Sequence, residues 1–309
     1  MSLTNMLKSR PPFGAFLLMA ALAWGAAVPG QVPSPLADSP ERAALFSYDR
    51  SALLDVRETK VEKRGGATVK DVDFAPVPGG KRVKAFLVVP AGAGPFAGVL
   101  WVHWLGDKLS NRDQFLEEAV ALAPRGAVSL LVDGMWAGPK WYESRDIDQD
   151  FEASVRQVIE LRRALDLLAG EKGVDPARIG VVGHDYGGMY ATFLARFDGR
   201  ARTYVLAAVT PSLMDWAFFS AQPRSRIDYI KKMAALDLMD ALRRATGASF
   251  LFQFGKNDDY VSAAGASVYF AAAPGVKERK LYHAGHSLAL PAVACDRADW
   301  LAQELGLSR

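Results

Sequence analysis

Short runs of consecutive apolar residues recur along the chain, separated by segments with helical periodicity. The runs lie at residues 98–102, 128–132, 179–182, 204–209 and 250–254. A strand of a parallel sheet has this continuous apolar pattern when helices cover both faces of the sheet. We therefore predict that these runs form the centre of a parallel sheet.

Further strands are expected at both ends of this series. Residues 71–74 alternate between aspartate and an apolar side chain, as in a half-buried strand. A Pro-Gly turn at 77–80 leads into a strand over 82–89, and a more polar last strand ends at 281–282. Together the runs predict an eight-stranded, mostly parallel sheet.

The segments between strands have the spacing of amphipathic helices. Apolar residues recur at helical spacing over 155–168, and Gly170 closes that segment. Other helices are expected at 111–123, 187–198, 262–272 and 289–305. Alternating strands and helices predict an α/β fold with a doubly wound sheet, in which ligands bind beyond the carboxyl ends of the strands.

The N-terminus has the pattern of a secretory signal. Lys8 and Arg10 precede an apolar run over 13–27, which ends in small residues that signal peptidase accepts. The run has about 15 residues, fewer than the roughly 20 that span a bilayer. We predict a signal peptide over 1–27 and an exported protein, periplasmic or secreted, with an uncleaved membrane anchor as the alternative.

The rest of the chain is expected to form one domain. Residues 28–60 have the composition of a Pro-rich linker and an N-terminal extension, and residues 61–309 form the α/β domain. Residues 211–247 lie between two predicted strands and are long enough for a crossover helix and a small lid.

Composition and charge limit the kinds of partner and cofactor that we expect. The net charge is +3 with both signs interspersed, so we expect a small-molecule substrate and no nucleic acid. Cys295 is the single cysteine, which leaves no intrachain disulfide and favours simple packing. The sequence has no Cys/His cluster and no phosphate-binding glycine loop, so we expect neither a metal nor an organic cofactor.

A candidate nucleophile follows the apolar run at 179–182. Residues 183–187 read Gly-His-Asp-Tyr-Gly and open a predicted helix. This is the form G-x-nucleophile-x-G, in which a sharp turn exposes the central side chain above the sheet. Asp185 occupies the nucleophile position; a helix N-cap is the alternative role for an aspartate there.

Two later strand ends carry the partners that such a nucleophile needs. Asp258 follows the run at 250–254, and His286 follows the last strand. The order nucleophile, acid, histidine is that of the α/β-hydrolase triad, in which the acid orients the imidazole and the imidazole acts as a base.

The chain from about residue 45 onward resembles the dienelactone-hydrolase-like branch of the α/β-hydrolase superfamily. The matching stretches are residues 96–103, 178–188, 255–261 and 284–286. The resemblance implies an α/β-hydrolase fold, with Asp258 rather than Asp259 as the acid and His286 rather than His283 as the base.

The sequence departs from that branch at two loops. Its elbow carries Asp where Ser or Cys is usual, and so resembles the elbow of epoxide hydrolases and haloalkane dehalogenases. The loop at 103–106 reads His-Trp-Leu-Gly instead of His-Gly. The resemblance implies that Leu105 and Tyr186 supply the oxyanion N–H groups, with Trp104 beside them. His103 is expected to be a hydrogen-bonded structural residue.

An aspartate nucleophile favours attack at an sp³ carbon. Attack on an acyl ester would give a costly mixed anhydride, whereas an epoxide or alkyl halide gives an ordinary ester that His-activated water hydrolyses. The alternatives are a carboxylic ester hydrolase of dienelactone-hydrolase type and a non-catalytic binding protein. Trp136, Trp141 and Trp216 are candidates for the substrate pocket, because they lie in loops after strands.

Overall fold

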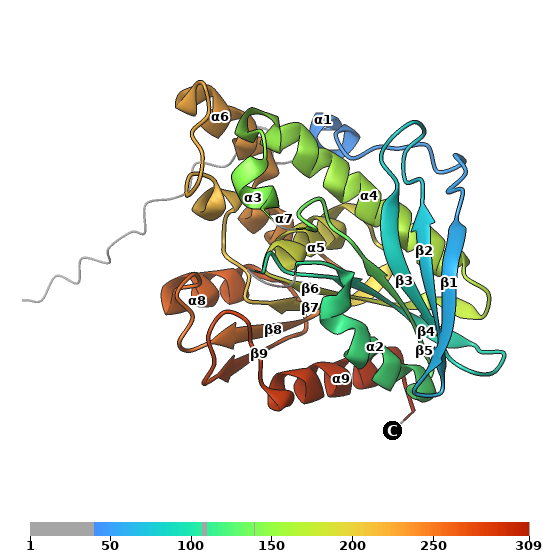
Figure 1. Ribbon diagram of the computed structural model, residues 1–309. Helices are drawn as coiled ribbons and strands as arrows, with labels where there is room; N and C mark the ends of the chain where they lie inside the picture. Colours follow the sequence, from blue (N-terminus) through green and yellow to red (C-terminus); the bar gives the residue numbers. More distant parts are fainter. Residues whose placement is uncertain (1–39, 107–109, 139, 309) are drawn as a thin grey trace, which may run out of the picture. The chain divides into compact units, whose positions relative to one another are not determined.

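The computed structural model describes residues 40–106, 110–138 and 140–308 (Figure 1). The predicted signal peptide over 1–27 lies outside the described residues, as does the beginning of the predicted linker. Among the described helices, none is both long and apolar enough to span a membrane.

The domain is built on one sheet of mixed direction. The strand order is β1-β2-β3-β5-β4-β6-β7-β8-β9. The first three strands pair antiparallel with their neighbours, and the six from β5 to β9 pair in parallel. The strands are β1 (Arg57–Arg64), β2 (Ala67–Phe74), β3 (Val83–Val89), β4 (Phe96–Val102), β5 (Ala127–Val132), β6 (Val174–His184), β7 (Ala201–Ala207), β8 (Ser249–Gly255) and β9 (Lys277–Tyr282).

The sheet has nine strands, so the expected number of eight is wrong by one. The added strand is β1, whose sequence is Arg-Glu-Thr-Lys-Val-Glu-Lys-Arg and whose side chains are largely exposed. It is an edge strand held by main-chain pairing to β2, and charged side chains are common on such edges. Because neither face is buried, the strand has no apolar alternation, and the expected domain boundary at residue 61 falls inside it.

Helices cover both faces of the sheet and enclose two cores. On one face α4 (Asp150–Gly170), α5 (Tyr186–Phe197) and α7 (Leu238–Arg243) pack over the large core, and on the other α2 (Leu116–Leu122) and α9 (Pro291–Leu305) cover a smaller one (Figure 1). The other described α-helices are α1 (Pro40–Ala44), α3 (Trp141–Ser144), α6 (Arg226–Met233) and α8 (Ala263–Ala272).

The described part of the predicted linker belongs to the folded domain. Phe46 is fully buried in the large core, with its ring 4.6 Å from that of Phe197. Arg42 is also buried and forms an ion pair of 2.6 Å with Asp240 on α7. These contacts fasten the segment before β1 to the helix layer.

The insertion after β7 has two parts. Its second part, α7, packs on α5 and serves as the crossover helix. Its first part holds a short 3₁₀ helix (Leu213–Trp216) and then α6, and it brings Trp216 and Phe219 to the cavity described below. This first part has the size of a small lid.

Candidate active site

Asp185 lies in a sharp turn between β6 and α5. Its backbone angles are φ 52° and ψ −117°, a conformation that non-glycine residues adopt only under strain. A Cβ atom on Gly183 would lie 2.4 Å from the carbonyl oxygen of Gly187, and one on Gly187 would lie 2.2 Å from that of Val102. The two glycines therefore let strand and helix approach closely enough to form the turn.

The turn brings Asp185 to the other two predicted triad residues. Nδ1 of His286 lies 2.9 Å from Oδ2 of Asp258, and Nε2 lies 3.5 Å from Oδ1 of Asp185. Asp258 also accepts the backbone N–H groups of Tyr260 and Val261 at 2.8 and 2.9 Å. The structure thus brings together the three residues in the order acid, base, nucleophile.

The two carboxylate oxygens of Asp185 have different surroundings. Oδ2 accepts the backbone N–H of Leu105 at 3.1 Å, and the backbone N–H of Tyr186 is close enough to the carboxylate to lower its pKa. Within the described part of the chain, Oδ1 of Asp185 and Nε2 of His286 have no hydrogen-bond partner. One oxygen is therefore held in the oxyanion position, while the other faces the imidazole.

Burial and pairing set the charges of the site. Burial raises the pKa of Asp185, although the nearby imidazole of His286 and the backbone N–H of Leu105 oppose the rise. Burial lowers the pKa of His286, but the two carboxylates outweigh it and raise that pKa to about 9. Burial would also raise the pKa of Asp258, but hydrogen bonds from His286 and Val261 hold it below its ordinary value. The pairing therefore favours the protonated form of the His286 imidazole at neutral pH.

Trp104 takes no part in the oxyanion position through its backbone. Its N–H donates to Oε1 of Gln114 at 2.8 Å, away from Asp185. Its carbonyl accepts Nδ1–H of His103 at 2.7 Å, and Nε2 of His103 accepts the N–H of Gly134 at 2.9 Å. Burial lowers the pKa of His103 to about 4, so this histidine is a neutral, fully bonded structural residue, as expected.

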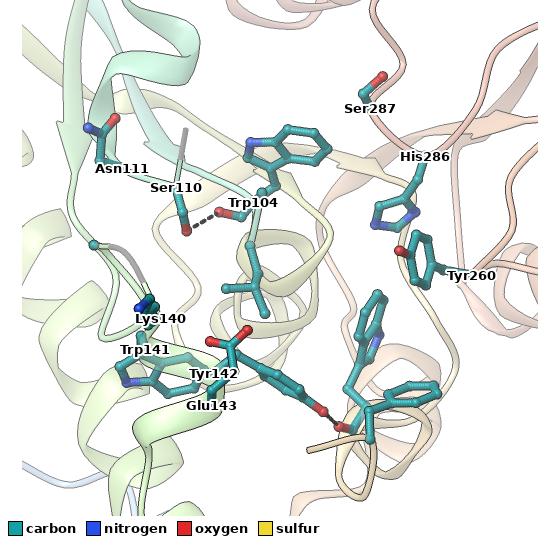
Figure 2. Close-up of a pocket in the computed structure, with 15 residues that line it drawn as sticks. Trp104, Ser110, Asn111, Lys140, Trp141, Tyr142, Glu143, Tyr260, His286 and Ser287 are labelled. Carbon is teal, nitrogen blue, oxygen red and sulfur yellow. Dashed lines mark hydrogen bonds between the residues drawn. The ribbon is translucent and has the colours of Figure 1, made fainter. Parts of the chain in front are cut away.

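A cavity of about 950 Å³ opens beside His286. Figure 2 shows Trp104 and His286 on one side of it and Trp141 across from them. The aromatic residues in its lining are Trp104, Trp141, Tyr142, Trp216, Phe219 and Tyr260. Trp216 stacks on Tyr260 with ring centroids 5.0 Å apart, and both rings lie within 6 Å of the imidazole. Polar side chains also line the cavity, those of Ser110, Asn111, Lys140, Glu143 and Ser287, so the site presents both aromatic and polar groups next to the base.

Trp136 does not line this cavity, in contrast to the expectation for it. Its side chain is fully buried, and its indole N–H donates to the carbonyl of Trp104 at 3.1 Å. Its ring stacks on Tyr190 in the core below the site. A loop tryptophan has no periodicity that separates packing from ligand contact, whereas Trp141 and Trp216 do reach the cavity.

No protein-family profile and no curated protein matches the sequence significantly. The solved structure of acetyl xylan esterase 1 from Thermoanaerobacterium sp. JW/SL YS485 superposes with a TM-score of 0.71 at 15% identity, over 85% of this chain and 92% of that one. The acetyl xylan esterase from Paenibacillus sp. R4 gives 0.70 at 18% identity, over 86% and 92%. The chain has the α/β-hydrolase fold.

Another α/β-hydrolase structure with high similarity is the glucuronoyl esterase from Solibacter usitatus. Its TM-score is 0.65 at 16% identity, over 86% of this chain and 91% of that one. At this level of identity the likeness establishes the fold, and the elbow aspartate and the dienelactone-hydrolase branch stay predictions from the sequence.

The α/β-hydrolase scaffold places functional side chains that sequence patterns did not single out. Tyr260 stands against His286, and its position two residues after the predicted acid was the available signal. Gln114 lies in a short 3₁₀ helix (Arg112–Phe115) and Arg145 directly follows α3, and neither belongs to a motif. Arg145 donates to the carbonyls of Tyr142 and Ala217 at 2.6 and 2.7 Å, which ties the two cavity walls together.

Among the described residues, no group of three or more His, Cys, Asp or Glu side chains is arranged to hold a metal ion.

Proposed function

We propose that the protein is a hydrolase in which Asp185 attacks an sp³ carbon of a small electrophile, of the epoxide or alkyl halide type. The observation that carries the proposal is that the two oxygens of the Asp185 carboxylate have different surroundings. Oδ2 accepts the backbone N–H of Leu105, whereas Oδ1 has no hydrogen-bond partner among the described residues and lies 3.5 Å from Nε2 of His286. A carboxylate arranged in this way is suited to act as a nucleophile.

The same arrangement disfavours attack by Asp185 on an acyl carbon. In acyl transfer the backbone N–H groups must bind the oxyanion that develops on the substrate. Here the N–H of Leu105 already binds Asp185 itself. The product of acyl attack would also be a mixed anhydride, whereas attack at an sp³ carbon gives an alkyl ester.

The proposed reaction has two steps, formation of an alkyl ester on Asp185 and hydrolysis of that ester. Oδ1 of Asp185 forms a bond to the substrate carbon, and the bond from that carbon to its leaving group breaks with its electron pair. The proton of the resting imidazolium goes to the alkoxide of an opened epoxide, or to solvent when a halide leaves, so that His286 becomes neutral. His286 next removes a proton from water, and the hydroxide attacks the carboxyl carbon of the ester. The N–H groups of Leu105 and Tyr186 hold the oxyanion that forms on Oδ2. The alcohol leaves with the proton, and Asp185 is restored.

The charges favour this order of steps. A protonated His286 cannot act as a base, and its pKa of about 9 depends in part on the charge of Asp185. Forming the ester removes that negative charge, so the pKa of His286 falls and the imidazole becomes a base only after the first step.

Carboxylic ester hydrolysis is the second candidate function. It is supported by the structural neighbours, whose names describe acetyl xylan and glucuronoyl esterases. In this function Asp185 and His286 together would activate a water for direct attack on the ester carbonyl. The comparisons favour this candidate, while the side chain at the elbow favours the first. A non-catalytic binding role would leave the paired Asp258 and His286 without a purpose.

The two enzymatic candidates differ in whether an enzyme-bound ester forms. The test is His286→Gln in the protein without residues 1–27, exposed to pooled epoxides, haloalkanes and activated esters. His283→Gln is the matched control, because His283 lies on the same loop but is exposed and contacts Lys256 instead. We expect mass spectrometry to find an alkyl group on the peptide that contains Asp185 in His286→Gln alone. The first candidate fails if no adduct forms and ester turnover is lost in His286→Gln.

A further inference from the structure

The reacting groups lie on loops that the sheet does not hold together directly. Leu105 follows β4 and Asp185 follows β6, and these two strands pair with each other. His286 follows β9, with β7 and β8 between it and β6. Strand pairing therefore fixes the nucleophile relative to the oxyanion donor. Main-chain hydrogen bonds from Lys256 and Asn257 tie the base loop to the loop after β8, so side chains must connect it to the oxyanion loop.

His184, the neighbour of the nucleophile, reaches the base loop. Its Nε2 lies 2.9 Å from the backbone carbonyl of His286, and the side chain is 2% exposed. Burial and the charge of His286 lower the pKa of His184 to about 3, so its imidazole is neutral. A carbonyl only accepts, so Nε2 carries the proton and Nδ1 must accept a hydrogen bond.

Gln114 completes a connection to the oxyanion loop. Its Nε2 donates to Nδ1 of His184 at 2.6 Å, and its Oε1 accepts the N–H of Trp104 at 2.8 Å. Each hydrogen bond in this series fixes the orientation of the next group. An unbroken series of hydrogen bonds thus runs from Trp104 through Gln114 and His184 to the carbonyl of His286.

The series also explains why Leu105 is the oxyanion donor. Gln114 turns the N–H of Trp104 away from the nucleophile, and the next N–H along the chain, that of Leu105, then points to Oδ2 of Asp185. The indole ring of Trp104 lies parallel to the imidazole of His184, at 5.1 Å between centroids and 15° between planes. The oxyanion loop is therefore held both by its peptide and by its side chain.

We propose that His184 and Gln114 are positioning residues that set the general base against the oxyanion donor, and that they act on hydrolysis of the enzyme-bound ester. The proposal rests on the covalent mechanism proposed above. Attack by Asp185 does not use His286 as a base, whereas hydrolysis needs both Leu105 and His286 correctly placed around the ester at the same time. Loss of the series therefore slows the second step more than the first.

This difference has a kinetic signature that general loss of stability lacks. When only the second step is slowed, kcat and KM fall by the same factor, kcat/KM is kept, and the covalent ester accumulates during turnover. We expect a fall of about tenfold in kcat and in KM for Gln114→Met and for His184→Met. His184→Gln retains a donor and an acceptor, so it should keep most of the native kcat.

The experiment measures steady-state kinetics and the fraction of enzyme that carries the adduct, using the electrophile that labels His286→Gln. Gln253→Met is the matched control, since this buried glutamine bonds Tyr282 and Val293 and no residue of the series. Thermal unfolding of each variant is recorded, and kinetics are compared at a temperature where all are folded.

The proposal is supported if the adduct accumulates in Gln114→Met and in His184→Met but not in the control Gln253→Met. His184→Gln should also show little adduct and a kcat near the native value. It is overturned if kcat and KM stay native in both methionine variants, or if kcat/KM falls without any accumulation. Failure of the covalent mechanism itself is separate, because it appears as the absence of an adduct in His286→Gln.

Discussion

At the scale of single residues, the chemistry depends on which atom occupies the oxyanion position. Asp185 fills it with its own Oδ2, whereas a shorter hydroxyl side chain would leave the N–H groups of Leu105 and Tyr186 free. In the proposed mechanism, the identity of the elbow residue therefore selects between attack at an sp³ carbon and attack at a carbonyl.

We expect Asp185→Ser to exchange one activity for the other. Turnover of epoxides or alkyl halides should fall by at least about 10³-fold, because attack by a serine hydroxyl would give an ether, which has no carbonyl carbon for water to attack in the second step. Hydrolysis of activated esters should rise, because the freed N–H groups can bind a substrate oxyanion. Both rates are measured on one preparation. Unchanged epoxide or halide turnover in the variant would contradict the role of Asp185.

The charge of His286 gives a second prediction at this scale. The two carboxylates raise its pKa to about 9, so Asp258→Asn should lower that pKa. Nuclear magnetic resonance of the imidazole protons against pH measures it directly. Asp259→Asn is the matched control, because Asp259 is exposed and Asp258 is the residue that bonds Nδ1. An unchanged His286 pKa in Asp258→Asn would mean that the pairing does not govern the base.

At the scale of elements, the sequence patterns predicted the strands that are buried and missed the strand that is exposed. The apolar runs predicted the central strands because helices cover both of their faces. The edge strand β1 has no buried face and thus no pattern. The triad was predictable because G-x-Asp-x-G and two later strand ends keep their order in the chain. Gln114 and Arg145 were not, since their roles depend on contacts between distant segments.

The segment before β1 carries an element-scale prediction. Phe46 is fully buried against α5, and truncating it leaves a cavity. We expect Phe46→Ala to lower the free energy of unfolding by about 3–5 kcal/mol in urea titration. Leu53→Ala is the control, because Leu53 is 86% exposed and should change it by less than about 0.5 kcal/mol. Equal effects would mean that this segment does not contribute to the core.

At the scale of the whole molecule, the sheet gathers residues far apart in sequence at the carboxyl ends of its parallel strands. Leu105, Asp185, Asp258 and His286 follow β4, β6, β8 and β9 in turn. The first part of the insertion and the loop with Trp141 then close an aromatic cavity over them. Export stays a prediction from the sequence, and N-terminal sequencing of the protein from its natural host would test cleavage near residue 27.

The protonation of His286 also links the site to overall stability. Its folded pKa of about 9 lies above the ordinary value of 6.5, so its contribution is complete below pH 6.5 and is lost as pH rises through 9. We expect the free energy of unfolding to fall more steeply between pH 7 and 10 in the native protein than in His286→Gln. Parallel curves from denaturant titration would contradict this.

The central claim is that Asp185 becomes covalently bonded to the substrate carbon. It is tested most directly by a single turnover in H₂¹⁸O, with enzyme in excess over the electrophile that labels His286→Gln. The account predicts that the product carries no ¹⁸O and that the label enters the Asp185 carboxyl group, because water attacks the ester at that carboxyl carbon. Label in the product and none in Asp185 would show direct attack by water and would contradict the account.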